Sequence, residues 1–92
     1  MITIKLSKEV EFEGKKYTEL SLDYDKLTGR DIMSAEKEAS VVAGRPVVDV
    51  DKTYQAVLAA KASGVVSDMI FNLPAKDFVG VVGTAQDFLL GI

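Results

Sequence analysis

Paired aspartates are the residues of this sequence best suited to chemistry. Asp23 with Asp25, and Asp49 with Asp51, are spaced so that both members of a pair could face one hard cation from an extended backbone. The chain has no histidine and no cysteine, which excludes Ser-His and Cys-His nucleophilic sites. A Ca²⁺ site needs about six to eight oxygen ligands, and aspartates in turns or at helix starts are commonly caps. We therefore predict no catalytic residues, no metal site and no cofactor, and a protein that is not an enzyme.

Two glycines near the C-terminus, Gly80 and Gly83, could suggest a phosphate-binding loop. Their spacing matches no Walker or dinucleotide fingerprint, and no lysine follows in the required place. Inside a helix each glycine costs about 1 kcal/mol relative to alanine. We therefore expect a packing role, in which another element approaches the backbone there or the helix bends.

Length and composition predict one globular domain over residues 1–92, with 48% hydrophobic and 27% charged residues. The net charge is −3 and the basic residues are scattered, which argues against nucleic acid as a partner. No apolar run approaches the roughly 18 to 20 residues of a membrane span, so neither a membrane anchor nor a signal peptide is expected. The lack of cysteine fits a reducing compartment.

Residues 1–24 alternate between apolar and polar side chains, which predicts a β-hairpin with its turn around Gly14. A loop with an odd number of residues would place even positions opposite even positions, so that apolar side chains of both strands share a face. A two-residue loop would instead set Phe12 beside Lys15. We therefore favour the odd loop, and we expect a bend at Lys8, where the apolar face is interrupted.

Helices are predicted at residues 28–43, 51–63 and 74–90, and a short fourth helix at 66–72 is favoured over a strand. Thr28 with Asp31 and, separately, Asp51 are expected to cap helix N-termini, while glycines end the helices. Residues 47–51 are predicted to be a loop. Since two strands alone are barely stable in water, helices must cover the apolar face of the hairpin. The predicted fold class is α+β, an N-terminal antiparallel hairpin followed by three or four helices.

The C-terminal helix carries more apolar residues than one core contact requires. Steps of about 100° per residue place most of them on one stripe: Phe78, Val81, Val82, Ala85, Phe88, Leu89 and Ile92. Val79 and Leu90 lie off that stripe. In the helix at 28–43, an inner stripe is formed by Ile32, Ala35, Ala39, Val42 and Ala43, and Met33 and Val41 lie outside it.

This surplus predicts contact with a partner through Met33, Val41, Val79, Phe88 and Leu90. The simpler interpretation is that the helix at 74–90 is the central core helix of the domain.

Three short motifs follow the hairpin in order. Leu27-Thr28-Gly29-Arg30-Asp31-Ile32 opens a Glu-containing helix, Leu73-Pro74-Ala75-Lys76-Asp77-Phe78 opens the last helix, and Gln86-Asp87-Phe88-Leu89-Leu90-Gly91 closes it. This order, over nearly the whole chain, resembles the small tail assembly chaperones of tailed bacteriophages, particularly the type found in Mu-like prophages.

The resemblance implies a non-virion protein of the host bacterial cytoplasm. Such a protein binds the long helical tape measure protein, keeps it soluble and lets tail tube protein assemble around it. The resemblance also implies a longer, frameshifted form, of which a chain of this length would be the short form. Two other readings stay open: a small phage structural subunit that assembles with itself into a ring or connector as a homo-oligomer, and an enzyme that uses the aspartates with a metal.

Overall fold

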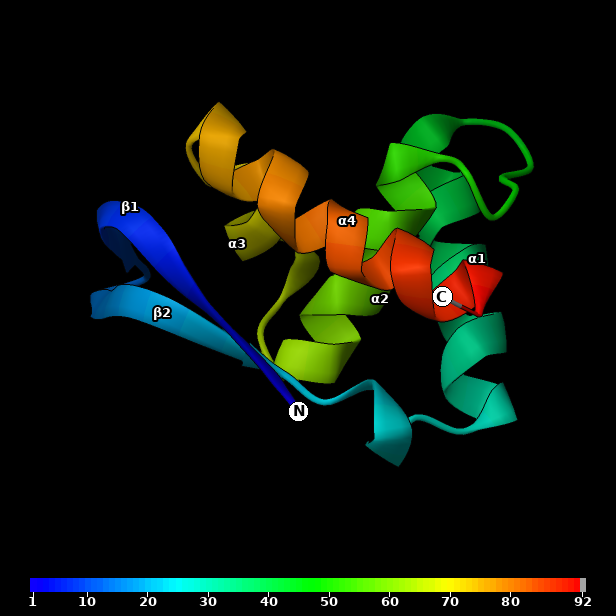
Figure 1. Ribbon diagram of the computed structural model, residues 1–92. Coiled ribbons are helices and arrows are strands. Elements are labelled where there is room, and N and C mark those ends of the chain that lie inside the picture. The colour runs from blue at the N-terminus through cyan, green and yellow to red at the C-terminus, as the bar shows by residue number, and fades with distance from the viewer. Residues whose placement is uncertain (92) are drawn as a thin grey trace.

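The computed structural model describes residues 1–91 and shows an antiparallel hairpin followed by four helices (Figure 1). The elements are β1 (Ile2–Phe12), β2 (Lys15–Leu22), the single 3-10 turn η1 (Tyr24–Lys26), α1 (Gly29–Ala43), α2 (Lys52–Ser63), α3 (Ser67–Phe71) and α4 (Ala75–Leu90). The predicted α+β class is confirmed, as are the short fourth helix and the loop at residues 47–51.

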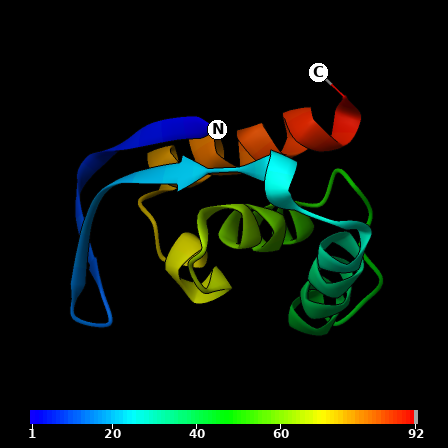
Figure 2. The same cartoon turned by 90° about the horizontal axis from the view of Figure 1, so that it is seen from below.

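Helix α2 is the centre of the domain. Figure 2 shows it between α4 and α1, and α3 and β2 also pack on it. Its buried residues point to every side of the helix: Tyr54, Gln55, Ala56, Val57, Leu58, Ala59, Ala60 and Ala62. The many alanines let neighbouring elements approach closely from all directions. The interpretation of residues 74–90 as the central core helix is therefore wrong, because α2 occupies that place.

The hairpin has a different turn from the one predicted. Glu13 and Gly14 form a two-residue turn, both with positive φ (52° and 78°), and Phe12 lies opposite Lys15. The odd loop is therefore wrong. Between the pairs Lys5–Glu19 and Val10–Tyr17, four residues of β1 oppose one residue of β2, so β1 carries three extra residues.

This irregular segment, residues 6–9, contains Lys8, where the bend was expected. Because the number of extra residues is odd, even positions face even positions again beyond it, with Ile4 opposite Leu20 and Ile2 opposite Leu22. The parity that the apolar pattern demands is thus restored inside the strand and not in the turn.

Helix α1 begins at the predicted capping box. The Thr28 hydroxyl accepts from the Asp31 N–H at 3.4 Å, and the Asp31 carboxylate accepts from the Thr28 N–H at 2.9 Å. The backbone hydrogen bond from Thr28 lowers the pKa of Asp31. Val42, predicted on the inner stripe, is exposed instead, because the fully buried contact of α1 is limited to Ala35 and Ala39.

Asp51 precedes α2 but does not cap it with its side chain. Its carboxylate accepts two hydrogen bonds from the Arg45 guanidinium, at 2.9 and 3.1 Å, and one from the Val48 N–H at 2.8 Å. The hydrogen bond from Arg45 is the main reason that the pKa of Asp51 is lowered. Asp51 therefore fixes the loop between α1 and α2, which explains one member of the aspartate pairs without a cation.

Helix α4 lies across α2 with one face and leaves the other open. Val81, Val82 and Ala85 are buried, Phe78 and Leu89 are half-buried, and Ile92 lies outside the described residues. A Cβ built on Gly80 or Gly83 would meet no heavy atom within 4 Å beyond the adjacent helix backbone. The packing role predicted for these glycines is therefore wrong within the protomer.

The hairpin is tied to α4 by a single buried carboxylate. Asp77, in the first turn of α4, is 6% exposed and accepts from the Ser7 N–H and the Ser7 hydroxyl, both at 2.9 Å. Ser7 belongs to the irregular segment of β1, where its N–H does not pair with β2. The polar groups of the irregular segment and of the start of α4 are thus hydrogen-bonded to each other.

We expect Asp77→Ala to lower the free energy of unfolding by about 1 to 3 kcal/mol, because it leaves the Ser7 N–H without an acceptor in a partly buried place. Urea unfolding followed by circular dichroism measures this. Ser7→Ala is the matched control and should cost only about 0.5 to 1.5 kcal/mol, since the backbone bond remains. Equal stability of Asp77→Ala and the wild type would contradict the assignment.

We expect Gly80→Ala to raise the free energy of unfolding by about 0.5 to 1 kcal/mol. The added methyl group meets open space, and alanine loses less backbone entropy in a helix than glycine does. Thermal unfolding at low protein concentration measures the change. A destabilised variant would show that some part of the protomer does approach this backbone.

Candidate functional site

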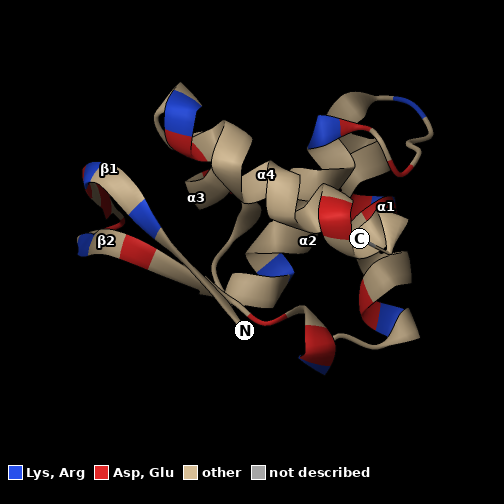
Figure 3. Ribbon diagram, viewed as in Figure 1, with Lys and Arg blue, Asp and Glu red and all other residues tan. Residues whose placement is uncertain are grey.

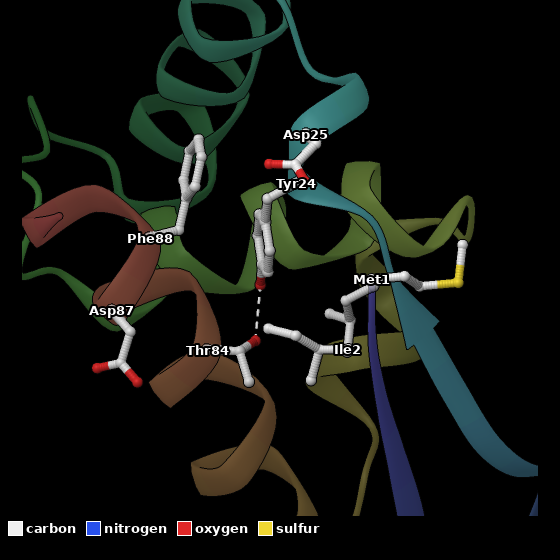
Figure 4. A pocket seen from close by; sticks show the side chains of 8 residues that line it. Met1, Ile2, Tyr24, Asp25, Thr84, Asp87 and Phe88 are labelled. Atoms are coloured by element: carbon white, nitrogen blue, oxygen red, sulfur yellow. Dashed lines mark hydrogen bonds between the residues drawn. The ribbon is translucent and has the colours of Figure 1, made fainter. Parts of the chain in front are cut away.

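An open groove of about 290 Å³ lies between the start of β1, the turn η1 and the last turns of α4. Its lining residues are Met1, Ile2, Leu22, Tyr24, Asp25, Thr84, Asp87 and Phe88. Figure 4 shows Ile2 and Met1 on the strand side and Thr84, Asp87 and Phe88 on the helix side, with Tyr24 between them. Met1, Ile2 and Phe88 are 80%, 43% and 38% exposed, so the groove offers apolar surface to a partner.

Tyr24 forms the floor of the groove, and Phe88 forms its wall on the helix side. Their rings stack with centroids 5.0 Å apart and an angle of 17° between the planes. The Tyr24 and Thr84 hydroxyl oxygens are 2.7 Å apart, and the Thr84 hydroxyl donates to the Val81 carbonyl at 2.7 Å. Because a hydroxyl has one hydrogen, Thr84 accepts from Tyr24. The ring of Phe88 is therefore held by a buried and hydrogen-bonded neighbour.

The groove combines an apolar floor with an acidic rim. Asp25 and Asp87 lie at its edge, and none of the side chains of the described lining residues is basic. Burial raises the pKa of the Tyr24 phenol, while its bond with Thr84 lowers it by a smaller amount. Tyr24 is thus neutral at physiological pH. An apolar side chain flanked by lysine or arginine is the chemistry that fits this surface.

The predicted partner-contacting residues fall into separate places. Phe88 lines the groove, whereas Val79 and Leu90 are 61% and 49% exposed on the outer side of α4. Met33 and Val41 are 66% and 76% exposed on α1, a different helix. The structure therefore brings Phe88 together with strand residues and does not gather the five candidates into one patch.

The strand side of the groove was not foreseen from the sequence. The alternation of the hairpin places Ile2 with the other apolar residues of its strand, and Met1 and Tyr24 carry no periodic signal of their own. The adjacency of Tyr24 to the end of β2 is the one local hint, because a large aromatic residue right after a strand must pack near that strand's end. The groove depends on tertiary contacts that periodicity does not encode.

Residues 1–91 gather no group of three or more acidic side chains that could hold a metal ion. None of the helices within those residues is both long and apolar enough to cross a bilayer.

The fold and the groove define a small hairpin-and-helix domain with an open groove that exposes apolar side chains. Residues 3–90 match the family described as phage tail assembly chaperone proteins, E, or 41 or 14. The protein belongs to this family, which confirms the resemblance stated from the sequence, and its partners are therefore phage tail proteins. Neither a curated protein nor a solved structure gives a significant match.

We expect Tyr24→Phe to lower the free energy of unfolding by about 0.5 to 1.5 kcal/mol near neutral pH, through loss of the bond to Thr84. The variant should also lose less stability in alkali. The pKa of the Tyr24 phenol is higher in the folded protein than its ordinary 10.0, so its contribution is complete below pH 10 and is lost as pH rises through the folded value. Urea unfolding at a series of pH values tests this, and an unchanged alkaline loss would contradict it.

Proposed function

We propose that this tail assembly chaperone binds apolar helical segments of the phage tape measure protein and keeps them soluble until tail tube protein surrounds them. It acts by binding and not by catalysis, in the cytoplasm of the host bacterium. The observation that supports this most is the groove, where Met1, Ile2 and Phe88 expose apolar surface beside a rigid aromatic stack. Covering apolar client surface removes it from water and from other clients.

The size of the groove suggests how a client is covered. About 290 Å³ holds one or two large side chains and cannot enclose a whole helix. Each copy of the chaperone then covers a short segment, and a long client binds several copies. Such contacts are weak individually and easily reversed, which suits a protein that must leave when tube subunits arrive.

The charge of the protein supports the same proposal. The net charge of −3 helps to keep a complex soluble, and the acidic rim formed by Asp25 and Asp87 favours client helices with a basic residue next to an apolar one. Met33 and Val41 on α1 provide a second, separate contact in this proposal.

The experiment compares two variants that each introduce one carboxylate at an exposed apolar position. Ile2→Asp places the charge in the groove. The matched control is Val50→Asp, because Val50 is 63% exposed in the loop before α2. Fragments of the tape measure protein of the same phage are titrated by calorimetry, and their aggregation is followed by light scattering. We expect Ile2→Asp to weaken binding at least about tenfold and to lose the protection against aggregation, with Val50→Asp unchanged.

Two results would go against the proposal. If Ile2→Asp bound the fragments as tightly as the wild type, the groove would not be the client site. The same titration with Met33→Asp and Val41→Asp would then test the surface of α1. A wild-type protein that neither binds tape measure fragments nor delays their aggregation would remove the proposed function itself.

A further inference from the structure

We propose that two copies of this chain pair through the outer face of α4, antiparallel and related by a two-fold axis. The outer face consists of Lys76, Val79, Gly80, Gly83, Asp87 and Leu90, on the side of α4 that faces away from the buried Val81, Val82 and Ala85. Figures 1 and 2 together show α4 at the outside of the molecule, with no other element lying over this side.

The outer face combines exposed apolar side chains with two glycines. Val79 and Leu90 are 61% and 49% exposed, and the space above Gly80 and Gly83 is empty. Glycines at these positions weaken the helix without any gain inside the protomer. A second backbone can approach closely at such a place, and the flanking apolar side chains would then be removed from water.

The two charged residues of the outer face are placed against the dipole of their own helix. Lys76 lies in the first turn of α4, where the dipole favours acids, and Asp87 lies near its C-terminus, where it favours bases. Figure 3 shows charged residues near both ends of α4 and uncharged residues between them. The ion pairs recorded within residues 1–91 involve neither of them.

Antiparallel pairing reverses both unfavourable placements. Lys76 then lies beside the C-terminal end of the partner helix, and Asp87 lies beside its N-terminal end. The register also fits, because Lys76 is four residues before Gly80 and Asp87 is four residues after Gly83. With the two-fold axis midway between the glycines, each Lys76 faces the Asp87 of the other copy, and the glycines lie at the point of closest approach.

The same symmetry leaves the apolar part of the groove free, while Asp87 at the edge of the groove belongs to the contact. At about 100° per residue, Val79 and Leu90 lie on one side of the line through Lys76, Gly83 and Asp87, whereas Phe88 lies on the other side. A two-fold axis perpendicular to both helices places the same side of each helix on the same side of the dimer. The exposed valine and leucine of both copies therefore share one side of the pair, and both grooves open on the opposite side.

The proposed contact is self-complementary, so it closes at two copies and cannot build a ring. It involves one short helix from each copy, which puts the buried area at the low end for specific interfaces. A reversible dimer that forms with rising concentration is therefore expected, and the contact of a client with a single groove does not require it.

The test uses charge reversal and sedimentation equilibrium at low ionic strength. We expect the wild type to dimerise, and Lys76→Glu and Asp87→Lys each to weaken the homodimer about tenfold, because each changes two symmetry-related attractions into repulsions. An equimolar mixture of these two variants should form a heterodimer with about the wild-type affinity, since every facing pair is then of opposite charge. The double variant should form homodimers again.

Gly80→Leu tests the close approach independently of charge. A Cβ at this exposed position meets no heavy atom within 4 Å, so circular dichroism should show a folded protein, while the homodimer should weaken at least about tenfold. Three results would each overturn the pairing: a wild type that stays monomeric or forms larger closed assemblies, charge variants that dimerise like the wild type, or a mixture no tighter than its components. Tape measure binding by Lys76→Glu, measured in the same samples, separates failure of the pairing from failure of the proposed function.

Discussion

The place of β1 against α4 depends on the two hydrogen bonds between Ser7 and Asp77, while β2 is held by its packing on α2. A two-stranded sheet is marginal in water, and none of the side chains of β1 is fully buried here. The three extra residues of β1 turn the Ser7 N–H away from β2, and Asp77 accepts it at the beginning of α4. The strand and the helix are fixed side by side in this way, and their far portions become the two walls of the groove.

The central position of α2 explains why α4 has apolar surface to spare. Alanines at half of its buried positions allow α1, α3, α4 and β2 to pack on it from different sides. Burial is thereby concentrated on one helix, and α4 needs to contribute only the face that holds Val81, Val82 and Ala85. The remaining apolar residues of α4 therefore stay at the surface, where Phe88 lines the groove and Val79 and Leu90 lie on the outer face.

Features that depend on neighbouring residues could be predicted from the sequence, and features that depend on distant ones could not. The Thr28–Asp31 cap and the end of α4 at Gly91 follow from local hydrogen bonding and from the ease with which glycine adopts positive φ. The carboxylate of Asp51, by contrast, has groups available for capping α2 or for binding Arg45 in the preceding loop. Only the approach of Arg45 decides between these two contacts. The alternation of apolar residues showed that an odd number of unpaired residues must separate the two strand registers. It did not show that these residues lie in β1 and not in the turn.

The groove illustrates the same limit for the candidate site, since its residues come from both ends of the chain and from η1. Periodicity identified Phe88 as a residue with apolar surface to spare, but it assigned Val79 and Leu90 to the same partner. In the structure these residues lie on different sides of α4, which allows each side a different partner. In the proposed dimer the two grooves open on one side, so a single long apolar client could contact both copies at once. The second contact would then be intramolecular, and two weak grooves would hold the client more tightly than either alone.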